Sequence, residues 1–182
     1  MDEDIIPPTR FPLIELQRDS QGRANCARAW ARLDVGVDAC KAALDGIERE
    51  ASFGEFVRHI PMVREIKREG DLMRIDLQLK VALFSVKFGA MTRLVRESER
   101  ALRIDYVEGE PVGLSLRFAY SEPSSLGGKA LLITTSSYDI DSLGWLAKNF
   151  LRHHPEIRDG AQAGTAVAIV EALRTAIEKR IK

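Results

Sequence analysis

The chain has 182 residues, of which 45% are hydrophobic and 30% charged, and its 27 basic residues balance its 27 acidic ones. This composition is typical of one globular domain large enough to bury a core, and it excludes a mainly disordered chain. The basic excess of a dedicated nucleic-acid or anionic-membrane binder is absent, so we expect no nucleic-acid partner.

The first residues are acidic and proline-rich. Residues 1–12 carry three acids and three prolines, so we expect a flexible arm that precedes a single domain over 13–182. The start lacks the basic and apolar regions of a signal peptide, and we find no apolar run long enough to insert stably in a membrane. The two cysteines suggest neither a disulfide framework nor a four-cysteine zinc site. These features predict a cytoplasmic protein.

The domain begins with a possible hairpin. Residues 13–18 are compatible with one strand, 19–22 supply turn residues, and a second strand starts near Ala24. In the second strand, alternate residues from Ala27 to Val35 are apolar and mostly alanine, while Trp30 falls on the opposite face. A face made of alanine predicts that a bulky element packs closely against it, and we expect that element to be the final helix.

Two short helices follow, over 39–48 with Asp38 as N-cap and over 53–59. We then expect six antiparallel strands. The second of these alternates clearly from Met73 to Leu83, after which the apolar register slips by one residue at Phe84. A slip of this kind predicts a bulge or a sharp bend within one strand. The other five strands are expected near 63–69, 91–96, 102–106, 114–120 and 129–138.

The remainder is helical. A helix capped by Asp141 and Ser142 reaches Leu151, and Pro155 starts the last helix, which is apolar nearly all round over 163–173. The fold class is therefore α+β, with a bent antiparallel sheet of about seven strands in the order β-α-α-β6-α around a long C-terminal helix.

This order resembles the helix-grip fold of the START, polyketide cyclase and birch-pollen-allergen superfamily (SRPBCC), over about residues 24–180. The resemblance lies in the stretches 31–38, 56–63 and 102–109, and in a strand that reads Leu116-Arg-Phe118 where the family usually has Trp-x-Phe. The polyketide cyclase/lipid-transport and coenzyme-Q-binding branches are the most similar.

The resemblance implies a cavity between the sheet and the C-terminal helix that holds a hydrophobic molecule. It implies no cofactor and no metal, and it carries over no catalytic residue, because the superfamily has no universal one. The residues that we expect to line the cavity are Phe56, His59, Ile75, Leu77, Leu79, Phe84, Tyr106, Leu114, Leu116, Phe118, Tyr120, Ile133, Trp145, Val167 and Val170. Of these, we expect Trp145 near the entrance.

Few polar or titratable side chains fall in the expected interior. Tyr106 and Tyr120 follow the apolar register, so their hydroxyls should enter the interior and need partners; Thr134 and Thr135 are further polar candidates. His59 would sit at the cavity mouth, where a solvated helix end competes with a role in proton transfer.

The favoured function is the binding or carriage of a lipid-, quinone- or polyketide-like molecule. Two alternatives stay open. One is an aromatase/cyclase-type enzyme in which the same cavity folds a reactive chain. The other is an interaction module with a filled core and no ligand.

Overall fold

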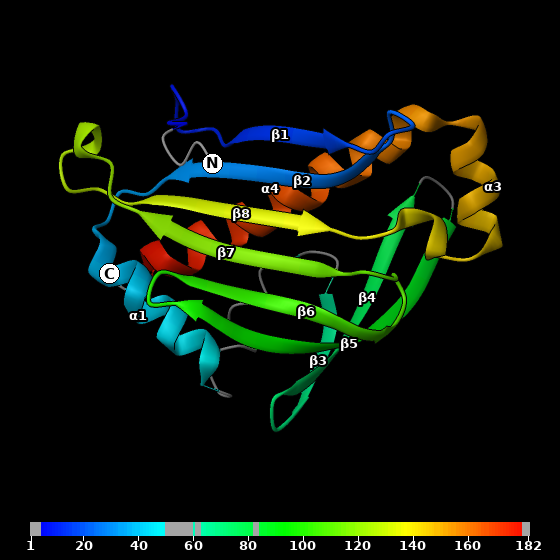
Figure 1. Cartoon of the computed structure of the whole chain (residues 1–182), viewed down its shortest axis with the longest axis horizontal. Helices are drawn as coiled ribbons and strands as arrows, with labels where there is room; N and C mark the ends of the chain where they lie inside the picture. The colour runs from blue at the N-terminus through cyan, green and yellow to red at the C-terminus, as the bar shows by residue number, and fades with distance from the viewer. Residues whose placement is uncertain (1–4, 50–59, 61–62, 82–83, 180–182) are drawn as a thin grey trace.

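A curved antiparallel sheet surrounds one long helix (Figure 1). The computed structural model describes residues 5–49, 60, 63–81 and 84–179. The strands are β1 (Leu13–Arg18), β2 (Ala24–Arg32), β3 (Val63–Glu69), β4 (Leu72–Val81), β5 (Phe84–Ser98), β6 (Ala101–Gly109), β7 (Ser115–Ser121) and β8 (Leu131–Ser137). The helices are α1 (Val37–Glu48), α3 (Trp145–His153) and α4 (Pro155–Lys179), with short 3₁₀ turns η1 (Ser124–Leu126) and η2 (Ile140–Ser142).

The eight strands form one sheet in the order β1-β2-β8-β7-β6-β5-β4-β3. The predicted α+β helix-grip class is confirmed, and so are six strands between the early helices and the C-terminal ones. The count is eight rather than seven because the segment 13–18 does form a hairpin with β2, in which Leu13 pairs with Trp30. The predicted second short helix, over 53–59, lies outside the described residues.

The register slip at Phe84 marks a change of strand, so the predicted bulge is wrong. Val81 at the end of β4 pairs with Phe84 at the start of β5, with two residues between them. In such an antiparallel pair, odd-numbered residues of one strand lie opposite even-numbered residues of the next. Leu77 therefore pairs with Phe88, and Ile75 with Ala90. The apolar face is thus continuous across β4 and β5, and the segment 91–96 is part of the long strand β5 rather than a strand of its own.

Two predicted helix starts are also wrong. The N-cap of α1 is Gly36, and Asp38 lies within the first turn, where its negative charge faces the positive end of the helix dipole. Asp141 and Ser142 belong to η2, and α3 begins after Gly144, whose φ of 90° favours glycine.

Helix α4 packs on the alanine face of β2, as predicted. Ala27, Ala29 and Ala31 have no exposed surface, and they share one core cluster with Ala166 and Val170 of α4. Small side chains on both partners let the helix axis approach the strand closely. The main sheet contacts of α4 are with β1, β2 and β8.

The opposite face of the sheet carries a second, smaller cluster. Trp30 is 1% exposed there and packs with Ala119 and Ile133, covered by Ile5 and Ile6 of the N-terminal segment. The placement of Trp30 on that face is confirmed. Ile133 is not a lining residue of the inner face, because it pairs laterally with Trp30 and its side chain therefore points away from α4.

Candidate ligand-binding site

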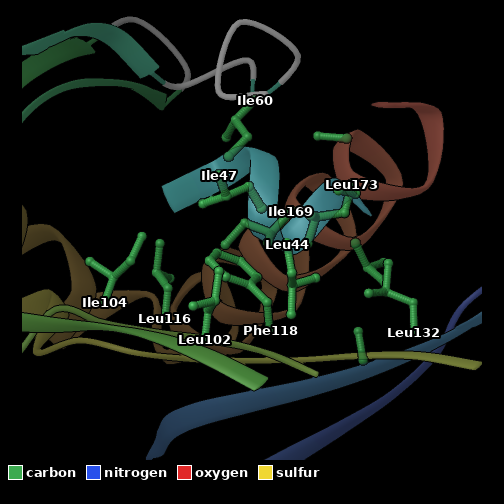
Figure 2. Packing of buried hydrophobic residues seen from close by; sticks show 14 of the residues in the cluster. Leu44, Ile47, Ile60, Leu102, Ile104, Leu116, Phe118, Leu132, Ile169 and Leu173 are labelled. Carbon is green, nitrogen blue, oxygen red and sulfur yellow. The ribbon is translucent and has the colours of Figure 1, made fainter. Parts of the chain in front are cut away.

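The inner face of the sheet is apolar where α1 and α4 cross it. Leu102, Ile104, Leu116 and Phe118 rise from β6 and β7 (Figure 2). Figure 2 also shows Leu44 and Ile47 of α1 and Ile169 and Leu173 of α4 above them. Side chains from three layers of the chain thus meet in one apolar interior.

The same face continues beyond the part of the sheet that α4 covers. Met73, Ile75 and Leu77 of β4 are each less than a tenth exposed, and Phe88 of β5 packs against the same cluster. Because the main contacts of α4 are with β1, β2 and β8, this apolar area lies beside the helix rather than beneath it. The sheet turns away from α4 here, as β3, β4 and β5 show in Figure 1.

A group of polar side chains lies between β8 and α4. Thr134 and Ser136 are 1% exposed on the inner face of β8, and Gln162 of α4 is fully buried. Their Oγ1, Oγ and Oε1 atoms have no hydrogen-bond partner among the described residues. Leaving such a group unsatisfied costs about 1–3 kcal/mol. These three side chains, on the facing surfaces of β8 and α4, are called the polar patch below.

The edge of this patch is hydrogen-bonded. Gln162 Nε2 donates to the Tyr138 carbonyl at 3.1 Å, and the hydroxyls of Tyr138 and Thr165 lie 3.0 Å apart. Burial raises the pKa of Tyr138 above its ordinary value, and the hydrogen bond with Thr165 opposes this only in part. Tyr138 is therefore a neutral hydrogen-bonding group at neutral pH.

The structure brings most of the predicted lining residues into the core cluster or against it. These are Ile75, Leu77, Tyr106, Leu114, Leu116, Phe118, Tyr120 and Val170. Val167 is half-buried on α4, and Trp145 is 74% exposed on α3. Phe56 and His59 lie outside the described residues, and Leu79 and Phe84 are placed by strand pairing alone.

The polar groups of the interior differ from those expected. The Tyr106 hydroxyl donates to the Gly109 carbonyl at 3.0 Å, and that of Tyr120 donates to the Glu99 carbonyl at 3.3 Å. Both are satisfied by backbone near strand ends. Thr134 does face the interior, whereas Thr135 pairs with Arg28 and Arg117 on the outer face.

Sequence reasoning missed Ser136, Tyr138, Gln162 and Thr165. A signal for them exists. Thr134, Ser136 and Tyr138 alternate along one strand face, and Gln162 and Thr165 precede Ala166 and Ile169 on the buried stripe of α4. Polar residues on a stripe that is otherwise apolar indicate an interior polar site.

A cation of the inner face is held in ion pairs. Arg96 of β5 contacts Glu48 at 2.7 Å and Asp45 at 2.5 Å, and both acids lie on α1. Glu48 first, and then Asp45, raise the pKa of this guanidinium. Arg96 therefore ties α1 to the sheet and is not free to bind an anion.

Within the described residues there is no group of three or more His, Cys, Asp or Glu side chains that could hold a metal ion. His153 and His154 are exposed, and His154 Nδ1 lies 3.3 Å from Glu156. In the described part of the chain, no helix has the length and apolar character needed to cross a membrane.

Comparison by sequence identifies no relative: no family model and no curated protein matches. Comparison by structure does. The fold is similar to that of TTHA0849 from Thermus thermophilus, with a TM-score of 0.58 and 13% identity over 85% of this chain and 98% of that one. It is similar to human StAR-related lipid transfer protein 5, with a TM-score of 0.58 and 11% identity over 97% and 86% of the two chains. The Zhui aromatase/cyclase from Streptomyces sp. R1128 matches with a TM-score of 0.53 and 12% identity over 86% and 95%.

A sheet that curves around a long C-terminal helix, with an apolar inner face, defines the helix-grip class of proteins. Within that class, the fold of the chain is START-like.

Proposed function

We propose that this protein binds and carries a hydrophobic small molecule on the inner face of its sheet. The observation that carries the proposal is the combination of an apolar face extending past α4 with three unsatisfied oxygens between β8 and α4. A mostly apolar site with a few polar groups is the usual construction of a small-molecule site. The fold adds support, since one similar structure is a lipid transfer protein and another an aromatase/cyclase.

In this proposal the apolar body of the ligand lies against Ile75, Leu77 and Phe88. Its polar end is a neutral hydroxyl or carbonyl that approaches Thr134, Ser136 and Gln162. A neutral group is favoured because these three side chains are uncharged, and because Arg96, a cation of the same sheet face three strands away, is already paired with two acids. Lipid-, quinone- and polyketide-like molecules all have this chemistry.

The free state of Cys26 and Cys40 supports a cytoplasmic location. The division into an arm over 1–12 and a domain over 13–182 remains a prediction.

The second candidate is a cyclase-type enzyme acting on a polyketide-like chain. The observation that favours it is the Tyr138–Thr165 pair, because a buried phenol at the polar end of the site could donate a hydrogen bond to a substrate carbonyl. A carrier releases its ligand unchanged, whereas a cyclase returns a cyclic isomer, or a product that has lost water if dehydration follows. Liquid chromatography coupled to mass spectrometry of the recovered ligand therefore distinguishes the two by retention as well as by mass.

The test of the binding function is Leu116→Trp, compared with Leu132→Trp. Leu116 lies on β7, and Leu132 is fully buried on β8 next to Ala31 of β2, the strand on which α4 packs. If the interior holds a ligand, Leu116→Trp keeps its stability and binds Nile red more weakly than the wild type, while Leu132→Trp loses about 1–3 kcal/mol through overpacking. Native mass spectrometry of the wild type should show a bound mass. Equal destabilisation of both variants, in a protein that never binds Nile red, would leave only the filled-core interaction module.

A further inference from the structure

Helix α3 exposes a tryptophan on its polar face. Trp145 is 74% exposed, and Lys148, Asn149 and Arg152 are exposed with it. At spacings of three, four and seven residues, these four side chains share one side of the helix. Leu151, between Lys148 and Arg152 in the chain, is 5% exposed and packs with Ile140 and Leu143. The helix is therefore attached to the domain by one face and presents the tryptophan to solvent on the other.

The exposed face of α3 is basic. The nine residues of α3 include Lys148 and Arg152 and no acid. Both line a cleft of about 530 Å³ between α3, the start of α4 and the β1–β2 turn, together with three arginines and three acids.

The three acids of the cleft already have partners. Asp159 lies 2.5 Å from Arg18, Asp141 lies 2.6 Å from Arg158, and Glu156 faces His154. Among the described residues, no ion pair engages Lys148 or Arg152. The local excess of two positive charges is thus available to an external anion, although the whole chain is neutral.

We propose that α3 docks the protein on the surface of an anionic lipid membrane. Tryptophan favours the boundary between headgroups and acyl chains, where its ring is partly buried and its N–H stays hydrated. Lys148 and Arg152, on the same side of the helix, then face the lipid phosphates. This is contact with the membrane surface and involves no spanning segment. Figure 1 places α3 at one end of the molecule, beyond the end of β8, where a flat surface can reach it.

The proposal goes beyond ligand binding and does not depend on it. Membrane contact is measured on the full chain with vesicles alone, so failure to bind Nile red leaves the docking proposal intact. Failure to bind vesicles likewise leaves the ligand-binding proposal intact.

The first experiment is flotation with vesicles of phosphatidylcholine alone or with 30% phosphatidylglycerol. The wild type should float only with the anionic vesicles, and 0.5 M NaCl should abolish binding because two exposed charges are strongly screened. The chain has two tryptophans, and Trp30 is buried, so a blue shift of the emission on adding vesicles reports on Trp145. Trp145→Phe should lose that shift.

Matched variants test the assignment to α3. Lys148→Gln with Arg152→Gln should weaken binding by roughly 30-fold, given about fivefold for each basic residue at an anionic surface. The control Lys41→Gln with Lys179→Gln removes two exposed charges from α1 and the end of α4 and should bind as the wild type does. Trp145→Ser should weaken binding at least tenfold, whereas Phe11→Ser, which removes an 81% exposed aromatic elsewhere, should not.

The proposal would be overturned if the wild-type protein failed to float with anionic vesicles. That result is expected if α3 binds a protein rather than a membrane. Equal binding to neutral vesicles, or equal losses in the α3 variants and their controls, would also overturn it. Thermal unfolding checks that each variant is folded.

Discussion

The hydroxyl of Tyr138 lies 3.0 Å from the hydroxyl of Thr165, so the residue that follows β8 is hydrogen-bonded to the buried face of α4. Gln162, one helical turn earlier, donates to the carbonyl of the same tyrosine. These two bonds connect the end of the last strand to the helix that the sheet surrounds, two residues beyond Ser136, whose Oγ has no hydrogen-bond partner among the described residues.

Tyr138→Phe should lower the free energy of unfolding by about 1–2 kcal/mol, because Thr165 is left without a partner in a buried position. Urea unfolding measures this loss. Tyr106→Phe is the control: it removes a bond to an exposed carbonyl and should have a smaller effect. An equal loss in both variants would contradict a special role for the buried pair.

The raised pKa of Tyr138 predicts that the stability of the protein depends on pH. Because burial raises the pKa of Tyr138 in the folded state, its contribution to stability is complete below about pH 10 and is lost as the pH rises through the folded pKa. Tyr138→Phe should reduce the alkaline loss of stability, measured by urea unfolding between pH 9 and pH 11. A loss identical in variant and wild type would show that Tyr138 does not contribute to it.

Thr134→Val should raise the free energy of unfolding of the ligand-free protein by about 1 kcal/mol, because it removes a buried hydroxyl that has no partner. The same change should reduce any preference for 2-naphthol over naphthalene, measured by competition with Nile red. Thr135→Val, on the outer face, should change neither quantity. Destabilisation by Thr134→Val would mean that the hydroxyl already has a partner in solution.

Ala29→Phe should cost about 1–3 kcal/mol, because Ala29 has no exposed surface and lies on the face of β2 against which α4 packs. Thermal unfolding measures the effect. Asn25→Phe, at an exposed position of the same strand, is the control. An unchanged melting temperature for Ala29→Phe would contradict close packing of helix and strand.

Cys40 should be inert in the folded protein. Burial raises the pKa of its thiol from 9.0 to about 12, which lowers the thiolate fraction roughly 1000-fold at pH 8. In a Cys26→Ala variant, iodoacetamide should modify Cys40 in urea but not in native buffer, as followed by mass spectrometry. The stability contributed by the neutral thiol is complete below about pH 9 and is lost toward pH 12. Rapid modification of the native protein would contradict its burial.

Most of the order of elements could be predicted from the sequence, because it depends on local patterns. Alternation identified β4, β6 and β7, and Pro155 marked the start of α4. The alanines of β2 predicted the packing of α4, since only small side chains admit a helix so close to a strand. The change of register at Phe84 was visible too, but a hairpin with two residues between the paired positions and a bulge produce the same one-residue slip. Only the pairing of Val81 with Phe84 distinguishes them.

The candidate site depended on tertiary structure, because the two elements that form it lie far apart in the chain. Alternation assigned Tyr106 and Tyr120 to the inner face, but it could not show that backbone carbonyls from neighbouring loops satisfy their hydroxyls. It could not place Ile133 beside Trp30, because both faces of β8 carry apolar residues at its start and polar ones after them. Gln162 and Thr134 became one polar patch only when α4 crossed β8. A periodic pattern determines which side chains share a face, whereas the packing of distant elements decides what that face meets and which of its polar atoms are left without a partner.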